Sequence, residues 1–347
     1  MRKTIALILW IAAMLIPARV AALVDATAGT HADPSAVLNR PVATYSIVAR
    51  DSVTGEIGVA VQSHWFSVGP LVPWAEAGVG AVATQSFVDP AYGPLGLELM
   101  RLGRTAPEAL TALVAGDADE AVRQVAMIDA VGRVAAHTGN RAIYAAGHHI
   151  GAQYSVQANL MENPTVWEAM ARAYESAEGD LADRLLAALE AAEGEGGDIR
   201  GRQSAAIIVV AGTGTGRPWA DRIFDLRIED HPDPVAELRR IVRLQRAYLK
   251  LNEGDGLVTK NDLDRAMAAY REATSIVPDG ATNGEAPFWV GITLASAGRV
   301  DEALPYLARA HAQDRRWAQL VPRLVASGLL PDDAGLIERL VEGMKGK

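Results

Sequence analysis

Alternation of apolar and polar residues begins abruptly at Thr44 and predicts a β-hairpin. Its two strands cover 44–50 and 57–62, and the segment 51–55 between them has the composition of a turn. A third strand is predicted over 79–84, an apolar run among glycines. The chain from Thr44 onward therefore opens as a β structure.

Stretches with apolar residues every three to four positions predict helices, and further apolar runs predict strands. The predicted helices cover 96–102, 106–114, 118–128, 165–176 and 180–193. The predicted strands lie within 133–146 and over 204–210 and 220–228. Strands, helices, strands, helices and strands in this order indicate the stacked layers of an α+β fold and not alternating βαβ units.

The chain from residue 236 to 347 has a helical pattern throughout, and an amphipathic helix is predicted over 235–252. Two units after this helix resemble tetratricopeptide repeats (TPR), because characteristic residues lie at the expected places. In the first unit these are Ala266, Tyr270, Ala273 and Pro278, and in the second they are Gly291, Ala303, Leu307 and Ala310. A free solenoid needs about three units, and only two are predicted here. We therefore expect this module to pack on the domain at 44–235 or to self-associate. It either binds a peptide or protein partner or is a packed helical cap.

A basic start and a short apolar run identify residues 1–22 as a signal peptide. Arg2 and Lys3 precede the apolar run at 5–16, and small residues follow it. A membrane anchor is the alternative, but the run is shorter than the ~20 residues that cross a bilayer. We expect an exported protein, periplasmic or secreted, with no membrane attachment after signal removal. Residues 23–43 lack periodicity and are interpreted as a pro-segment or linker.

The composition of the chain narrows the chemistry it can perform. Its 347 residues include 33 Lys and Arg against 42 Asp and Glu, a net charge of −9, and no cysteine. An acidic chain without a basic patch is a poor partner for nucleic acid. Without cysteine, serine and threonine are the leading nucleophiles. His137, His148 and His149 lack the spacing of a metal site, and we predict neither a metal nor another cofactor.

Five segments of the chain carry a resemblance to one bacterial family. They are the opening stretch 43–103, HTG at 137–139, QANLM at 157–161, GDIRGRQSAA at 197–206 and DHPDP at 230–234. In these segments the chain resembles the family called domain of unknown function 1028. The resemblance implies a branch of the N-terminal nucleophile (Ntn) hydrolases, with a four-layer αββα sandwich over 44–235.

The resemblance also points to Thr44 as the nucleophile, because many members of the family have a threonine directly after the initiator methionine at this place. In an Ntn hydrolase the first residue of the mature chain attacks the substrate. Its own α-amino group, with a pKa of about 8, is the base. Thr44 therefore needs a cut after Ala43, made by its own hydroxyl or by another protease. Alternatively, Thr44 only begins an edge strand and residues 23–43 are a tail.

Residues near Thr44 in the predicted hairpin are candidates for the same cleft. Period-two geometry places Ser46 and Arg50 on the same strand face as Thr44, where both can bind substrate. The returning strand ends in Ser63 and His64, beside the nucleophile. Ser63 is a further substrate-binding candidate. His64 tunes the amine or orients the substrate, unless it is a solvated surface histidine.

Three polar residues from other segments complete the predicted site. Gln85 closes the third strand at the expected rim of the pocket. Asn159 is predicted to aim an N–H at the developing oxyanion, with a helix cap or turn as the alternative. Arg202 enters an apolar strand and binds an anionic group of the substrate, or forms an ordinary salt bridge.

These features favour an exported Ntn amide hydrolase. Thr44 attacks an amide carbonyl, forms an ester-linked acyl-enzyme and releases the acyl group to water. The substrate is a small-molecule or peptide amide that the sequence does not name. The alternative is a non-catalytic periplasmic binding protein that keeps the sandwich and presents the helical module.

Overall fold

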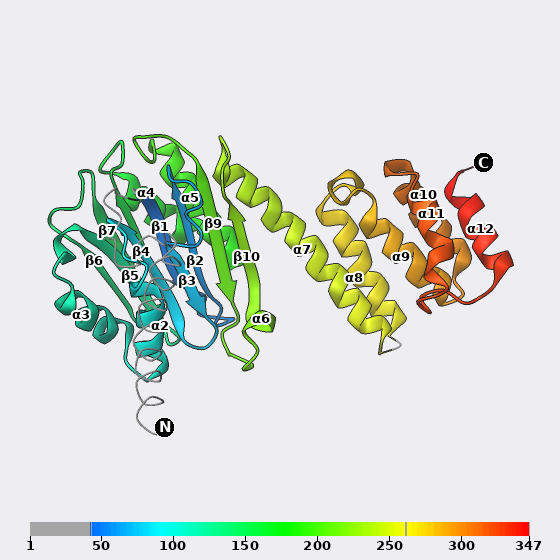
Figure 1. Ribbon diagram of the computed structural model, residues 1–347, viewed down its shortest axis with the longest axis horizontal. Coiled ribbons are helices and arrows are strands. Elements are labelled where there is room, and N and C mark those ends of the chain that lie inside the picture. The colour runs from blue at the N-terminus through cyan, green and yellow to red at the C-terminus, as the bar shows by residue number, and fades with distance from the viewer. Residues whose placement is uncertain (1–41, 43, 261, 347) are drawn as a thin grey trace, which may run out of the picture. The chain divides into compact units, whose positions relative to one another are not determined.

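The computed structural model describes residue 42, residues 44–260 and residues 262–346 (Figure 1). The predicted signal peptide lies outside the described residues, and so does the predicted pro-segment except for Val42. Among the described residues, no helix is both long enough and apolar enough to cross a membrane.

The described part of the chain forms two antiparallel sheets. The larger sheet has the order β10-β9-β2-β1-β8-β7, made of β1 (Thr44–Arg50), β2 (Ile57–Ser63), β7 (Gly147–Gly151), β8 (Tyr154–Asn159), β9 (Ser204–Val210) and β10 (Arg222–Ile228). The smaller sheet has the order β3-β4-β5-β6, made of β3 (Pro73–Glu76), β4 (Gly80–Ser86), β5 (Arg123–Asp129) and β6 (Val134–Thr138). The predicted hairpin is confirmed, because β1 pairs with β2 over its whole length.

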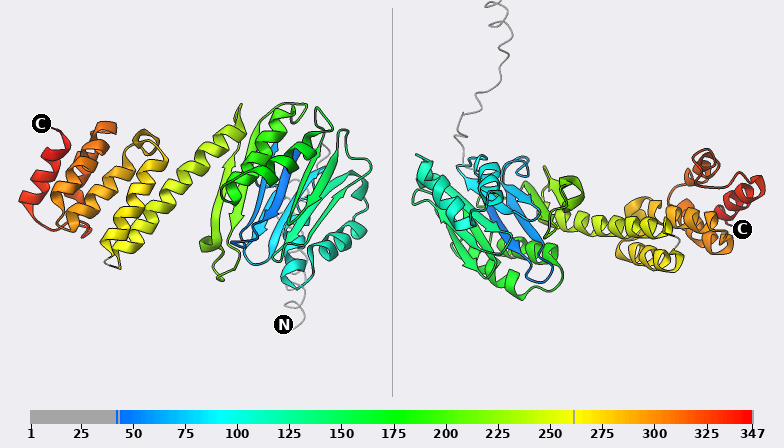
Figure 2. Two further views of the ribbon diagram at one scale, coloured as in Figure 1. Left: turned by 180° about the vertical axis from the view of Figure 1, so that it is seen from behind. Right: turned by 90° about the horizontal axis from the view of Figure 1, so that it is seen from below.

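The two sheets face one another, and helices cover the outer face of each (Figure 1, Figure 2). On the larger sheet these are α4 (Val166–Ser176) and α5 (Leu181–Gly194), and on the smaller sheet α2 (Tyr92–Arg101) and α3 (Ala106–Gly116). Two short helices join elements along the chain, η1 (Glu120–Val122) and α6 (Pro218–Asp221). The prediction of an α+β body followed by a helical region is confirmed.

The central strand β1 is buried on both faces because it lies between the helices and the second sheet. Tyr45, Ile47 and Ala49 belong to the apolar core shared with α4 and α5. The alternate residues, beginning with Thr44 and Ser46, point to the opposite face, where the smaller sheet covers them. This second face carries polar side chains in the interior of the protein.

The prediction of a helix over 118–128 is wrong, because residues 123–129 form strand β5. All seven residues of β5 are buried, with β4 on one side and β6 on the other. A short apolar run fits a buried strand as well as a helix, and here pairing with two neighbouring strands decides the outcome. The strands at 147–151 and 154–159 were not predicted, because glycine and histidine weaken the strand pattern in the first and the polar residues Ser155, Gln157 and Asn159 leave few apolar residues in the second.

The C-terminal region is helical, as predicted, and has a core of its own. It consists of α7 (Pro234–Val258), α8 (Leu263–Ile276), η2 (Asp279–Thr282), α9 (Glu285–Ser296), α10 (Val300–Gln313), α11 (Trp317–Leu320), η3 (Val321–Leu324) and α12 (Ala334–Met344). The small residues singled out in the sequence are buried, among them Ala266, Ala273, Ala303 and Ala310. They allow neighbouring helices to approach closely.

Helix α7 continues through the boundary predicted at residues 235–236. Val235, Leu238 and Val242 belong to the core of the larger sheet. Leu251 and Leu257, further along the same helix, belong to the core of the helical region. The two parts of the chain are therefore joined by a continuous helix and not by a loop.

Replacement of Gly291 by alanine tests the close packing of α9 against α10. A Cβ atom at Gly291 would lie 2.5 Å from Leu307 Cγ, so we expect the free energy of unfolding to fall by about 1–2 kcal/mol. Gly256→Ala in α7 is the matched control, because a Cβ there meets nothing within 4 Å and helix propensity favours alanine by up to ~1 kcal/mol. Urea denaturation followed by circular dichroism measures both variants. Equal stability of the two would contradict the close packing.

Candidate active site

A row of polar side chains crosses the larger sheet where β1 begins. Thr44 lies opposite Ser63 of β2 on one side and opposite Asn159 of β8 on the other. Ser63 lies in turn opposite Ser204, the first residue of β9. Directly opposed residues of antiparallel strands share a face, so the four side chains form one row. All four are fully buried.

Val42, two residues before the predicted nucleophile Thr44, covers the row. The Thr44 hydroxyl donates a hydrogen bond to the Val42 carbonyl oxygen at 2.7 Å and lies 3.3 Å from Ser63 Oγ. Val42 is fully buried and forms an antiparallel bridge with Ser86 at the end of β4. Its N–H donates to the Ser86 carbonyl at 2.7 Å, and its carbonyl accepts from the Ser86 N–H at 3.1 Å. In this structure the Thr44 hydroxyl is therefore covered by Val42.

Amide side chains connect the two sheets directly behind this row. The Ser46 hydroxyl donates to Gln85 Oε1 at 2.6 Å and accepts from Gln157 Nε2 at 2.5 Å. Gln85 Nε2 donates to Gln124 Oε1 at 2.7 Å, and Gln124 Nε2 donates to the Ala158 carbonyl at 2.9 Å. Sequence reasoning had found Ser46 and Gln85 but not Gln124 and Gln157, because contacts between two sheets leave no short-range pattern.

Asn159 joins this amide network through its nitrogen. Its Nδ2 donates to Gln124 Oε1 at 3.0 Å and lies 3.4 Å from the Thr44 carbonyl oxygen. The Gln124 nitrogen donates to the Ala158 carbonyl, which leaves the Gln124 oxygen as the atom that faces Asn159. An oxygen acceptor needs a donor, so the nitrogen of the Asn159 amide must point toward it. Asn159 Oδ1 is buried and has no hydrogen-bond partner among the described residues. The residue predicted to donate to an oxyanion thus presents an unpaired acceptor.

Arg50 and His64, both predicted site residues, have other partners than Thr44. Arg50 lies at the other end of the seven-residue strand β1, about 20 Å along an extended chain, and donates to Gln153 Oε1 at 2.6 Å. His64 donates its backbone N–H to Asp198 at 3.0 Å. In the described part of the chain, no hydrogen bond joins the His64 ring to Thr44, and its buried Nδ1 has no partner.

Arg202 belongs to an ion-pair network on the helix side of the larger sheet. Its guanidinium pairs with Glu193 of α5 and, at 3.6 Å, with Asp233. Glu193 also accepts a hydrogen bond from the Tyr45 hydroxyl. Burial, and then the Glu193 carboxylate, raise the pKa of Tyr45 well above its usual value. Because carboxylates of the chain itself occupy Arg202, the geometry favours the salt bridge over an anion site.

The three histidines singled out in the sequence each bind a partner of their own. His137 pairs with Glu120 at 3.2 Å, and His149 pairs with Glu168 at 3.1 Å. His148 Nδ1 lies 2.8 Å from the Thr138 hydroxyl. Burial, and then the charges of the other two histidines, lower the pKa of His148. Across the described residues, no three His, Asp or Glu side chains converge in a way that could hold a metal ion.

The described hydrogen-bond partners of Thr44 are uncharged. Among the described residues, no ion pair or hydrogen bond joins Thr44 to a charged side chain; hydroxyls, amides and backbone groups surround it. The sequence has no lysine between residues 4 and 249. No side-chain amine of the sandwich can therefore act as a base near the Thr44 hydroxyl.

Comparison with known proteins gives the family. The model of the family of unknown function DUF1028 matches residues 44–238, more than half of the chain. The chain belongs to this family. The match begins at Thr44, the first residue of β1, and ends within α7, so the helical region lies almost wholly beyond it.

Two solved structures are similar to the chain. The crystal structure of SPO2555 from Silicibacter pomeroyi, described with the same DUF1028 family model, has 31% sequence identity. The similarity covers 58% of this chain and 88% of that chain, with a TM-score of 0.52. Anbu (ancestral beta-subunit) from Yersinia bercovieri has 13% identity and a TM-score of 0.29 over 62% of this chain and 96% of that chain. No curated protein matches.

Substitution of Gln124 tests whether the buried amide network stabilises the site. Gln124→Met keeps the side-chain length but leaves Gln85 and Asn159 without their acceptor, and we expect a loss of about 2–4 kcal/mol in unfolding free energy. Gln62→Met is the matched control. Gln62 is equally buried, but neither of its amide atoms has a partner in the described part of the chain. Chemical denaturation should show that Gln62→Met loses little unfolding free energy or gains some. Equal losses of unfolding free energy in the two variants would contradict a specific role of the network.

Proposed function

We propose that this protein is an exported amide hydrolase of the Ntn type whose nucleophile is Thr44, exposed by removal of residues 1–43. The observation that carries the proposal is the position of Thr44. It is the first residue of the central strand and of the family match, it lies between Ser63 and Asn159 of the neighbouring strands, and its hydroxyl lies 3.3 Å from Ser63 Oγ. The helix–sheet–sheet–helix layers support an Ntn-like sandwich. The signal-peptide pattern of residues 1–22 supports export.

Cleavage before Thr44 supplies the base that the uncut site lacks. The new α-amino group has a pKa of about 8, so a substantial neutral fraction exists near neutral pH to accept the hydroxyl proton. Asn159 Oδ1, the unpaired acceptor of the row, is suited to hold one N–H of this amine. We therefore assign Asn159 to orientation of the amine and not to the oxyanion.

Departure of Val42 frees a donor for the oxyanion. In the uncut chain the Val42 carbonyl oxygen accepts from the Thr44 hydroxyl at 2.7 Å and from the Ser86 N–H at 3.1 Å. The Ser86 N–H thus points at a carbonyl oxygen that lies within hydrogen-bond distance of the nucleophile. A substrate carbonyl in the same place gains this backbone donor as negative charge develops on its oxygen.

The reaction then proceeds in two halves. The α-amine takes the Thr44 hydroxyl proton as Oγ1 attacks the carbonyl carbon. The C–N bond breaks, the ammonium gives its proton to the leaving amine, and an ester of Thr44 forms. Water, deprotonated by the amine, attacks this ester. The ester C–O bond breaks, Thr44 recovers its proton and the acid product leaves.

Among the described residues, the hydrogen-bond partners of Thr44 are uncharged, which favours a neutral amide as the reacting group. The Ser46 hydroxyl and the Gln85 amide are engaged in the network between the sheets, and Arg202 already has two carboxylate partners. Both a small-molecule amide and a peptide satisfy this requirement. The paired helices at 263–313, with their buried small residues, support a TPR-like module attached to the hydrolase.

Processing of the exported protein tests the proposal. Intact mass and N-terminal sequencing should find wild-type protein beginning at Thr44, and Thr44→Ala beginning at Leu23. Thr44→Ser keeps the hydroxyl and should still be cut, which separates loss of the nucleophile from loss of the fold. Wild-type protein that begins at Leu23 would contradict the proposal and favour a non-catalytic binding protein. If Thr44→Ala also begins at residue 44, another protease makes the cut and self-cleavage is excluded.

A further inference from the structure

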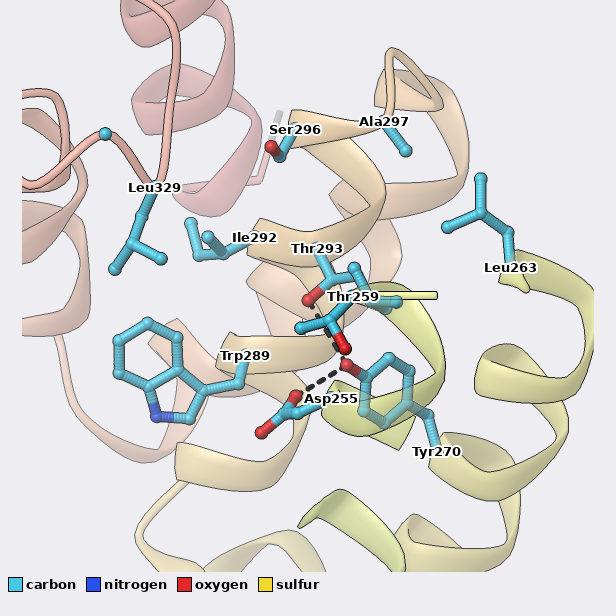
Figure 3. A pocket seen from close by; sticks show the side chains of 12 residues that line it. Asp255, Thr259, Leu263, Tyr270, Trp289, Ile292, Thr293, Ser296, Ala297 and Leu329 are labelled. Atoms are coloured by element: carbon cyan, nitrogen blue, oxygen red, sulfur yellow. Dashed lines mark hydrogen bonds between the residues drawn. The ribbon is translucent and has the colours of Figure 1, made fainter. Parts of the chain in front are cut away.

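A cavity of about 700 Å³ opens in the helical region, which the family match does not cover (Figure 3). It is lined by residues of α7, α8 and α9 and by the segment before α12. This volume lies within the range typical of small-molecule sites. Thr44 is not among its lining residues, so the cavity is separate from the hydrolase site proposed above.

One carboxylate lies in this cavity without a cation. Asp255 of α7 accepts a hydrogen bond from the Tyr270 hydroxyl at 2.6 Å, and that hydroxyl lies 3.4 Å from Thr293 Oγ1 (Figure 3). Asp255 forms no ion pair with any described residue, and no lysine or arginine lines the cavity. Tyr270 holds one carboxylate oxygen, which leaves the other available to a ligand.

Apolar and aromatic side chains form the remaining walls. Ile292, Leu329 and the indole of Trp289 line the cavity, and the Leu329 side chain is exposed (Figure 3). The Trp289 ring is held in place by edge contact with Phe288 at 5.1 Å between centroids and by its N–H, 3.4 Å from Glu285. Glu285 adds a second negative charge near the ring and is in no described ion pair.

We propose that this cavity binds an organic ammonium ion with an apolar body. The ammonium N–H groups bind the Asp255 carboxylate, the face of Trp289 stabilises the positive charge, and Ile292 and Leu329 cover the apolar part. An anionic ligand would meet uncompensated negative charge at Asp255. A purely apolar ligand would gain no interaction with that carboxylate, which is solvent-exposed. The ammonium belongs to a free amine or to a lysine side chain of a peptide.

Binding of phenethylamine to the full-length protein tests this site. The probe combines an ammonium with a phenyl ring, and 2-phenylethanol is its neutral counterpart. Nitrogen-15 labelling of the tryptophan indoles, with Trp289→Phe to assign the signal, reports binding at the cavity by NMR. We expect a dissociation constant of about 1 mM for the amine, with binding of the alcohol weaker by about tenfold.

Two variants show whether Asp255 causes the preference. Asp255→Asn keeps an acceptor for Tyr270 but removes the charge, and should abolish the preference for the amine over the alcohol. Glu253→Gln, two residues away and outside the cavity, should preserve it. Acetyl-Phe-Lys-amide is compared with phenethylamine to distinguish the two sources of the ammonium. Tighter binding of the dipeptide indicates a peptide lysine, and tighter binding of phenethylamine indicates a free amine.

Three results would overturn the proposal. They are equal binding of amine and alcohol, an unchanged preference in Asp255→Asn, and no shift of the Trp289 signal at about 20 mM of either amine probe. Because Thr44 is absent from this test, its outcome does not depend on whether the hydrolase proposal holds.

Discussion

The fold depends on how two sheets meet through buried polar side chains. Several fully buried amides and hydroxyls hydrogen-bond to one another across the interface, with Gln124 accepting from both Gln85 and Asn159. An unsatisfied buried group costs about 1–3 kcal/mol, so each member depends on its neighbours. Apolar residues of similar volume would join two sheets without the free-energy cost of unsatisfied buried polar groups. A polar interior at this place is therefore consistent with the chemistry that we propose for Thr44.

The same constraint explains why the site is closed in the uncut chain. Val42 supplies an N–H and a carbonyl to Ser86, and its carbonyl also satisfies the Thr44 hydroxyl. With the proposed removal of residues 1–43, the Ser86 backbone and the Thr44 hydroxyl would lose these partners together. A substrate amide offers the same two kinds of group, a carbonyl and an N–H. The proposed precursor thus protects the groups that the proposed enzyme uses.

Part of this site follows from the sequence alone. Period-two geometry and the hairpin place Thr44 opposite Ser63, because register in a short hairpin is a local property. The quoted family segments added Asn159, whose strand β8 had no clear pattern. Gln124 escaped notice because its segment was interpreted as a helix, and because only pairing of β5 between two strands brings it to the site.

Other residues show the limits of local reasoning. Arg50 shares a face with Thr44, but the rise of a strand carries it to the far end of the sheet. Arg202 lies within a family segment, yet its charge is neutralised by Glu193, which lies on another element. The cavity at Asp255 arises from three helices and a loop. No single stretch of sequence encodes it.

Covalent trapping tests the central claim most directly. The mature protein is treated with an acylating β-lactone, digested and analysed by mass spectrometry. The account predicts one acyl group on the hydroxyl of Thr44, in a peptide that begins at residue 44, and no such adduct in Thr44→Ala. An adduct on another residue, or a free N-terminal Thr44 that never reacts, would contradict it.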